Sequence, residues 1–366
     1  MPGFEVIGIE EQQEVNSIFL NGGGVLFRHG FDKLRSNSYK VKEFEYDFGT
    51  YIGNTNTLAV SSGTAALRVA IASLNLSPGD EIITQSFTFV ATAEAIVESG
   101  CIPVFTEINE TLNMDPLDLE KRITPKTKAV IVVHMLGTPA NLTQIKNICK
   151  SNNLYLIEDC ARAHGSMWKN KKLGSFGDLS CFSFYPSKNL GAVGEAGCVV
   201  TNNINYSKLI NSLKFFGQKA TYDYAYIGNN YKSSNLIMAS LNLKIDYLDS
   251  FNDKRNNAVS LYKNILKDNN NITFLEVDKN NYVNCHLCVI IVEDRDNLMK
   301  HLNNNNIECG IHYPNPLYLT EAYNKYESKY TIFSSLSKKI ISLPIYAEIE
   351  KDEIIYICST INSFYT

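Results

Sequence analysis

The chain has 366 residues, of which 45% are hydrophobic, and a formal net charge of −4. This length and composition allow one large domain and one smaller domain, and the acidic balance excludes the basic surface that a nucleic-acid partner needs. The opening residues Met1 to Glu5 lack the start of a secretory signal, and no stretch of about 18 apolar residues could span a bilayer. We therefore expect a cytoplasmic protein without a nucleic-acid or membrane partner.

The nine cysteines are an odd number spread along the chain, which favours free thiols over a disulfide framework. The close pair Cys285 and Cys288 lies in an apolar stretch that continues to Val292, and no second pair of ligands follows it. We interpret this stretch as a strand and expect no metal site.

Short β-branched runs alternate with helical patterns from about residue 57 onward. Examples of the helical patterns are Ala65 to Leu74 and Thr88 to Glu98. This alternation predicts an α/β fold with a large, mostly parallel sheet and helices on both of its faces. The predicted strands are Leu58–Val60, Glu81–Thr84, Pro103–Glu107, Ala129–His134, Leu154–Glu158, Cys181–Phe184 and Cys198–Thr201.

The pattern changes after residue 245. A long polar helix is predicted over Asp246 to Lys267, before strands near Ile272 to Val277 and Cys285 to Val292, with helices near Arg295 to Asn303 and Asp352 to Phe364. We expect residues 1–245 to form the large domain and residues 246–366 a smaller α+β domain.

A candidate anion site follows the first predicted strand. Ser62, Gly63 and Thr64 open a helix, where free backbone N–H groups and the helix dipole favour a phosphate. A simple serine or threonine N-cap is the alternative, and the segment lacks the Gly-Lys-Ser/Thr ending of a Walker loop.

Lys188 lies between an apolar strand and the glycine-rich stretch Gly191 to Gly197. Partial burial in such a place would lower the pKa of the amine and prepare it for a Schiff base. An ordinary exposed loop lysine is the alternative.

Two adjacent acids, Glu158 and Asp159, end another apolar strand. A carboxylate there can hold a pyridine nitrogen protonated, but neighbouring strand residues face opposite ways, so one of the two should enter the site and either could instead cap a helix. Phe87 and Phe89 follow the second strand, where a ring could lie on a planar cofactor while at least one of them packs in the core.

Taken in order, these motifs resemble fold type I pyridoxal-phosphate enzymes, and specifically the DegT/StrS-type sugar aminotransferases typified by perosamine synthetase. The resemblance covers nearly the whole chain. Its segments are Ser62–Leu67, Ser86–Thr92, Glu158–Ala161, Ser183–Asn189, Gly194–Gly197, Gly228–Tyr231 and Gly310–Pro314.

The resemblance implies a role for each matched residue. Ser62, Gly63, Thr64 and Ser183 would hold the phosphate of pyridoxal 5′-phosphate. Phe89 would stack on the ring, Asp159 would pair with its nitrogen, and Lys188 would form the Schiff base. Asn230 would reach the cofactor of a neighbouring subunit, which implies a homodimer with shared active sites, and His312 and Tyr313 would contact the sugar substrate.

Two residues depart from the family pattern. Arg162 stands where the family usually has a glutamine that contacts the ring hydroxyl, and it would either stabilise the phenolate there or turn to a carboxylate. Lys232 stands where arginine is common, so a bidentate contact is in doubt.

The implied reaction moves an amino group from glutamate, through pyridoxamine 5′-phosphate, to a nucleotide-linked 4-keto-6-deoxyhexose for surface polysaccharide, O-antigen or lipopolysaccharide. Three alternatives remain open. An aminotransferase acting on a free octulosonate-type keto sugar matches the opening Met1 to Glu5. A sugar 3-dehydratase would carry histidine in place of Lys188, and a non-catalytic relative would only bind cofactor or nucleotide sugar.

Overall fold

The computed structural model describes residues 7–21, 25–26, 33, 38–54, 56–326 and 335–366. The opening residues Met1 to Glu5, on which the octulosonate alternative depends, lie outside this range. None of the helices in these ranges combines the length and apolar character that a membrane span requires.

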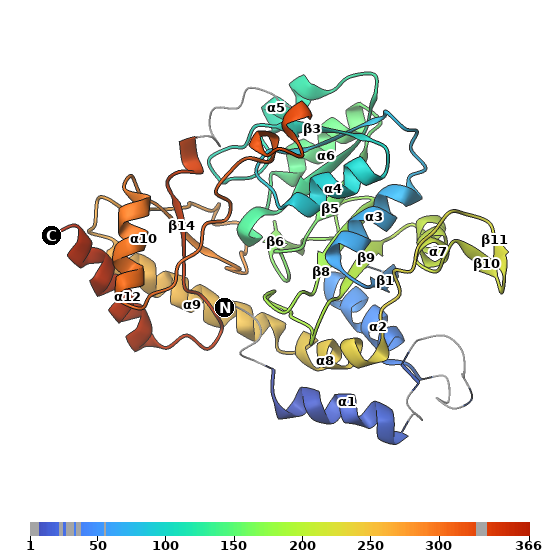
Figure 1. Ribbon diagram of the computed structural model, residues 1–366, viewed down its shortest axis with the longest axis horizontal. Coiled ribbons are helices and arrows are strands. Elements are labelled where there is room, and N and C mark those ends of the chain that lie inside the picture. The colour runs from blue at the N-terminus through green and yellow to red at the C-terminus, as the bar shows by residue number, and fades with distance from the viewer. Residues whose placement is uncertain (1–6, 22–24, 27–32, 34–37, 55, 327–334) are drawn as a thin grey trace.

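The centre of the molecule is a seven-stranded sheet with the strand order β1-β9-β8-β5-β4-β2-β3 (Figure 1). Strand β9 runs antiparallel to both of its neighbours, whereas the other six strands share one direction. The prediction of a large, mostly parallel sheet is confirmed. The strands are β1 (Asn56–Val60), β2 (Glu81–Gln85), β3 (Ile102–Thr106), β4 (Thr127–Val133), β5 (Tyr155–Asp159), β8 (Leu179–Ser183) and β9 (Gly197–Thr201).

Helices cover both faces of this sheet, as expected, because both sets of alternating strand side chains are apolar. Val130 and Val132 of β4 belong to one core, which also contains residues of α2, α5, α6 and α8. Ala129 and Ile131 belong to the opposite core, with residues of α3, α4 and α7. These helices are α2 (Lys40–Ile52), α3 (Gly63–Ser73), α4 (Val90–Glu98), α5 (Pro116–Arg122), α6 (Leu142–Ser151), α7 (Ile204–Leu213) and α8 (Asn235–Ile245).

A second, three-stranded antiparallel sheet forms a separate core with helices from the C-terminal third of the chain. It lies to the left of the large sheet in Figure 1, and the long helix α9 connects the two regions. These distinct cores support a division at residues 245 and 246, which we retain as a proposal. The elements are α9 (Leu248–Leu266), β12 (Thr273–Phe274), β13 (Cys288–Ile291), α10 (Arg295–Asn304), β14 (Ile340–Leu343) and α12 (Lys351–Phe364).

The remaining elements are short or peripheral. Helix α1 (Ile9–Asn21) packs against α8, while β6 (Met167–Trp168) and β7 (Lys171–Lys172) form a hairpin. A second hairpin, β10 (Gln218–Ala220) and β11 (Asp223–Tyr224), projects from the body at the right of Figure 1. The short 3-10 turns are Met135–Gly137, Leu317–Leu319 and Asn324–Tyr326.

The predicted strand over Cys285 to Val292 is too long, since β13 begins only at Cys288. The preceding backbone instead bonds to side chains: the N–H of Asn284 donates to Ser166 Oγ, and the N–H of His286 donates to Asn284 Oδ1. The strand predicted over Ile272 to Val277 is likewise reduced to Thr273 and Phe274.

Candidate active site

The strand ends of the large sheet gather most of the predicted site residues around one cavity of about 450 Å³. Because β1, β2, β5 and β8 share one direction, the segments that follow them meet at a single edge of the sheet. The predicted residues that line this cavity are Ser62, Gly63, Thr64, Phe89, Asp159, Arg162, Ser183, Lys188, His312 and Tyr313.

The start of α3 forms the anion-receptive end of the cavity. Ser62 is the N-cap, and its hydroxyl accepts a hydrogen bond of 3.1 Å from the N–H of Ala65. Ser62 therefore caps the helix, which was the alternative to an anion site. The other N–H groups of the first turn still have no acceptor within the helix. They provide a site for a phosphate group.

Two glycines allow this helix start to approach the sheet closely. A Cβ on Gly63 would lie 2.6 Å from the Cβ of Ser183, and a Cβ on Gly197 would lie 2.3 Å from the carbonyl oxygen of Ser62. Any larger residue would push the helix away from the ends of β8 and β9. The glycines thus place the free N–H groups beside the hydroxyl of Ser183.

Lys188 lies in the loop between β8 and β9. Its N–H donates to the carbonyl of Tyr185 at 2.8 Å, and the N–H of Ala192 closes the loop on the carbonyl of Phe184 at 2.9 Å. Burial and the nearby Arg162 guanidinium lower the pKa of the Lys188 amine to about 7. A large fraction of the amine is therefore uncharged and nucleophilic near neutral pH.

Asp159 is the acid that enters the cavity. Its carboxylate accepts hydrogen bonds from the hydroxyl of Thr92 at 2.9 Å and from the N–H of Ala161 at 3.1 Å. Burial raises the pKa of Asp159, although both hydrogen bonds and the nearby Lys188 oppose this rise. A cation placed against the carboxylate would restore its charged form.

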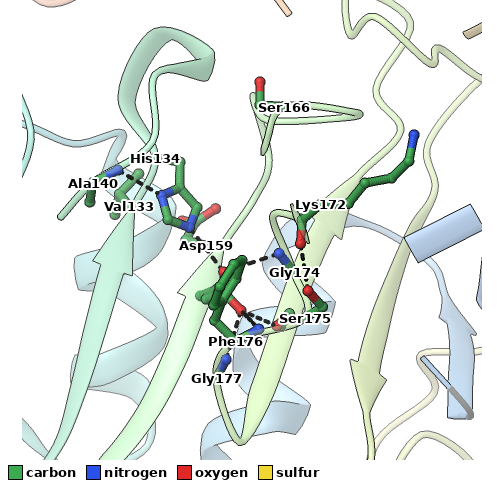
Figure 2. A network of polar contacts seen from close by, with 12 residues as sticks. Val133, His134, Ala140, Asp159, Ser166, Lys172, Gly174, Ser175, Phe176 and Gly177 are labelled. Atoms are coloured by element: carbon green, nitrogen blue, oxygen red, sulfur yellow. Dashed lines mark hydrogen bonds and ion pairs between the residues drawn. The ribbon is translucent and has the colours of Figure 1, made fainter. Parts of the chain in front are cut away.

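Glu158 faces the opposite way and binds the loop that follows β7. Gly174, Phe176 and Gly177 of this loop are labelled in Figure 2. The Glu158 oxygens accept from the N–H groups of Gly174, Phe176 and Gly177 and from the hydroxyl of Ser180, at 2.7 to 3.1 Å.

His134 completes this network. Its Nδ1 accepts from the N–H of Ala140, so Nε2 carries the proton and donates to Glu158 at 3.2 Å. Burial alone would raise the pKa of Glu158, but His134 and the backbone donors lower it.

His134, Glu158 and Cys160 also bring three potential metal-ligand atoms within 4.8 Å of one another. Because the Glu158 oxygens already accept five hydrogen bonds, we assign the group a structural role.

The two phenylalanines after β2 lie in different environments, one in the core and one at the cavity, as the sequence analysis allowed. Phe87 is fully buried in a small core, whereas Phe89 is 55% exposed and lines the cavity. The Tyr313 ring lies beside both, with centroid distances of 6.1 Å to Phe87 and 5.9 Å to Phe89. Phe89 is thus the ring available to a planar ligand.

Arg162 enters the cavity from the segment after β5. One terminal nitrogen donates to the hydroxyl of Tyr313, and the guanidinium carbon lies 5.1 Å from the centroid of that ring. The other terminal nitrogen is buried and has no partner among the residues that the structure describes. His312 Nδ1 is 2.9 Å from the Ser342 hydroxyl, and burial followed by the charge of Arg162 lowers the pKa of His312 to about 4.

Asn230 is the one predicted site residue that does not line this cavity. It is exposed, in the segment between β11 and α8, and it forms an isolated backbone bridge with Phe215. The amine of Lys232 contacts the side chain of Asn230 and lies 4.4 Å from the ring centroid of Phe215. The carbonyl of the neighbouring Tyr231 accepts a hydrogen bond of 2.9 Å from the N–H of Ser61, but Asn230 itself does not line the cavity of its own chain.

The sequence reasoning missed the pair Thr88 and Thr92. Their hydroxyls are 3.0 Å apart, and Thr92 in turn donates to Asp159. The available signal was their spacing of four residues, which places both on one face of a helix start.

This arrangement fits pyridoxal phosphate. The N-terminus of α3 suits the phosphate, the exposed face of Phe89 suits the ring, and the carboxylate of Asp159 suits a protonated ring nitrogen. The Lys188 amine suits Schiff-base formation with the cofactor's aldehyde. Fold and cavity together define an enzyme of the lysine-dependent aminotransferase class.

The model of the DegT/DnrJ/EryC1/StrS aminotransferase family matches residues 31–362, and the chain belongs to this family of pyridoxal-phosphate-dependent sugar aminotransferases. The dTDP-3-amino-3,6-dideoxy-alpha-D-galactopyranose transaminase of Aneurinibacillus thermoaerophilus is 33% identical over 97% of this chain and 95% of its own length. GDP-perosamine synthase of Escherichia coli O157:H7 is also 33% identical, over 91% and 92%.

Solved structures agree with this assignment. S. venezuelae DesV in complex with a ketimine intermediate superposes with a TM-score of 0.91 at 28% identity, covering 97% of this chain and 94% of DesV. NtdA from Bacillus subtilis with bound cofactor PMP gives a TM-score of 0.88 at 26% identity, over 98% of this chain and 82% of that protein.

Proposed function

We propose that this enzyme transfers an amino group from glutamate to a nucleotide-linked 4-keto-6-deoxyhexose, with pyridoxal phosphate held in the cavity beside Lys188. The observation that carries the proposal is the position of this lysine. Its amine, with a pKa near 7, lies in one cavity with the Asp159 carboxylate and the start of α3. These are the groups that an amino transfer through this cofactor requires.

In this proposal the cofactor phosphate binds to Gly63 and Thr64, with help from Ser62 and Ser183. Phe89 covers the ring, and Asp159, held by Thr92, pairs with the ring nitrogen. Arg162 lies near the ring hydroxyl, as the family resemblance implies. The bound cofactor supplies an electron sink for the carbon that loses its proton.

Lys188 would have two tasks. Its uncharged amine holds the cofactor until a substrate amine replaces it, and the freed amine then removes the proton from the donor's α-carbon. Glu195, which also lines the cavity, and Asp159 both oppose the fall of the Lys188 pKa. A pKa near 7 suits both steps, because the amine must accept a proton and release it again.

The names of the relatives support a nucleotide-linked sugar as the acceptor, since one acts on a dTDP sugar and another makes a GDP sugar. His312 and Tyr313 are the proposed contacts to the sugar. A second chamber of about 680 Å³ adjoins the cofactor cavity and offers further space for substrate. We propose that the product enters surface polysaccharide such as O-antigen, and that the enzyme acts in the cytoplasm.

We also propose a homodimer with shared active sites. Asn230 is exposed and does not line the cavity of its own chain, which leaves its side chain available to a neighbouring subunit. The β10–β11 hairpin and the residues after it expose large apolar side chains, including Tyr222, Tyr226 and Ile227. A subunit interface would bury this surface.

The test is an absorbance titration of the purified protein with pyridoxal phosphate. The wild type should develop the visible band of a lysine-bound cofactor, which glutamate then abolishes, whereas Lys188→Ala should not develop it. Incubation with glutamate and a nucleotide-linked 4-keto-6-deoxyhexose should then give an amino sugar that mass spectrometry detects. Absence of a lysine-dependent band would refute the enzyme assignment, and amination only of a free keto-sugar acid would refute the proposed acceptor.

A further inference from the structure

Two chambers meet beside Lys188. The first, described above, contains the start of α3 and Asp159, and the second lies toward the three-stranded sheet. A substrate that exchanges with the lysine amine would lie close to this junction, because Lys188 lines both chambers. The residues that line both chambers are Arg162, Ser187, Lys188 and His312.

Arg162 brings a positive charge to this junction without a matching negative charge. Tyr313 accepts from one terminal nitrogen, and the second terminal nitrogen is buried without a partner among the described residues. Within the same residues, no carboxylate lies at ion-pair distance from the guanidinium. A buried donor without a partner is costly, so this terminal nitrogen is available to an anion that enters the junction.

The groups around the guanidinium do not neutralise it. Lys188, His312 and His286 all have pKa values lowered by burial and by the charge of Arg162. The nearby acid, Asp159, is engaged by Thr92 and by the N–H of Ala161. Asp159 and Glu195 also line the first chamber, but within the described residues neither forms an ion pair with Arg162, so its unpartnered terminal nitrogen can still donate to an incoming carboxylate.

We propose that Arg162 binds the α-carboxylate of the amino donor. This inference rests on the proposed function and adds the residue that recognises the donor. In an α-amino acid the carboxylate is bonded to the same carbon as the amine, so a receptor for it belongs beside the group that exchanges with that amine. A guanidinium can bind a carboxylate through two parallel hydrogen bonds and carries a positive charge. A glutamine side chain in its place has no charge.

Calorimetry on unreactive holoenzyme tests this role. Borohydride reduction of the lysine–cofactor bond leaves the pocket loaded but prevents transfer. The reduced wild type and R162Q proteins are then titrated with L-glutamate and with L-isoglutamine, its α-amide. We expect R162Q to weaken glutamate binding roughly tenfold or more, since a charge-assisted contact is lost, and to leave isoglutamine binding unchanged.

Controls separate this role from folding and from cofactor binding. R162K keeps the positive charge but lacks the two parallel N–H donors of the guanidinium. It should therefore recover part of the glutamate affinity that R162Q loses. Equal glutamate affinity in wild type and R162Q overturns the proposal, even if the cofactor spectrum of R162Q changes.

A third ligand, 3-deoxy-octulosonate, distinguishes the source of the carboxylate. If R162Q weakens binding of this sugar acid but not of glutamate, the carboxylate belongs to the acceptor and the donor assignment is wrong. Failure of the wild type to form a reducible lysine–cofactor bond would instead refute the proposed function itself.

Discussion

The chemistry of Lys188 depends on groups contributed by distant parts of the chain. Arg162 lowers the pKa of the amine, and Asp159 and Glu195 raise it, yet burial has the largest effect. Sequence position alone predicted a partly buried lysine. The balance among these groups required the structure, because Asp159 and Arg162 lie at and just after the end of β5, whereas Lys188 and Glu195 lie in the loop between β8 and β9.

This balance predicts the pH dependence of lysine reactivity. In the cofactor-free protein, reductive methylation of Lys188 by formaldehyde and cyanoborohydride should rise with a midpoint near pH 7, because only the uncharged amine reacts. The sign follows from the lowered pKa: the reactive form already predominates above pH 7. Peptide mass spectrometry measures the modified fraction at each pH.

Lys40 provides an internal control for this measurement. Burial opposes its charge, but hydrogen bonds to Glu14 and Glu43 raise its pKa, so it should remain unmodified at the pH where Lys188 reacts. A common midpoint for the two lysines would contradict the pKa assigned to Lys188.

Neighbouring residues show where sequence reasoning on the site reached its limit. The alternation of a strand reduced Glu158 and Asp159 to one functional acid, but the choice of Asp159 came from the family resemblance. In the structure Asp159 lines the cavity and Glu158 faces the β7 loop, while the role of Asp159 stays a prediction. The hydroxyl pair Thr88 and Thr92 was missed, because side-chain hydrogen bonds leave no mark in a hydrophobic pattern.

At the scale of elements, the strands of the large sheet were predicted to within about two residues, since β-branched runs bounded by turns mark buried parallel strands. The smaller sheet was predicted poorly. Strand β14 (Ile340–Leu343) was not identified, and β13 begins three residues later than expected. Hydrogen bonds to and from the Asn284 side chain replace the strand pairing there. The local sequence has no pattern that predicts them.

The hydrogen bonds of Glu158 to the loop after β7 predict how much this one residue contributes to the stability of the fold. Glu158→Gln should lower the free energy of unfolding by about 3 kcal/mol, because an amide cannot satisfy five donors that a carboxylate accepts. Urea titration at pH 7 measures this change. Glu293→Gln is the matched control, since its pair with Lys339 is exposed and should contribute little.

The same network fixes the sign of its pH dependence. The pKa of Glu158 is lowered in the folded protein, so its contribution is present above its ordinary value near 4.5 and is lost as the pH falls through the folded value. The difference between wild type and Glu158→Gln should therefore shrink in acid. A difference that stays constant down to pH 3 would show that the charge of Glu158 is unimportant.

For the whole molecule, shared active sites predict complementation between two inactive variants. Lys188→Ala and Asn230→Ala should each lose amino transfer as homodimers. In a mixed dimer, one site combines the intact Lys188 of one subunit with the intact Asn230 of the other. Activity should return toward half of the wild-type value per dimer.

The experiment requires co-expression with two affinity tags and isolation of the doubly tagged species. If Asn230 served its own subunit, each site of the mixed dimer would carry one defect and no activity would return. A doubly tagged species that never forms would contradict the dimer itself.

The pairing of β1 also has a consequence for how the enzyme is made. Among the residues that the structure describes, β1 forms an edge of the large sheet and pairs with one strand, β9, which follows it about 140 residues later. At typical rates of synthesis, roughly 10–30 s separate the appearance of these strands on the ribosome. Until β9 emerges, β1 has no strand beside it among the described residues, and Gly197, against which Ser62 at the start of α3 packs, is missing. A nascent chain should thus become able to capture its cofactor only late in translation, and stalled fragments that end before residue 197 should depend on chaperones to avoid aggregation.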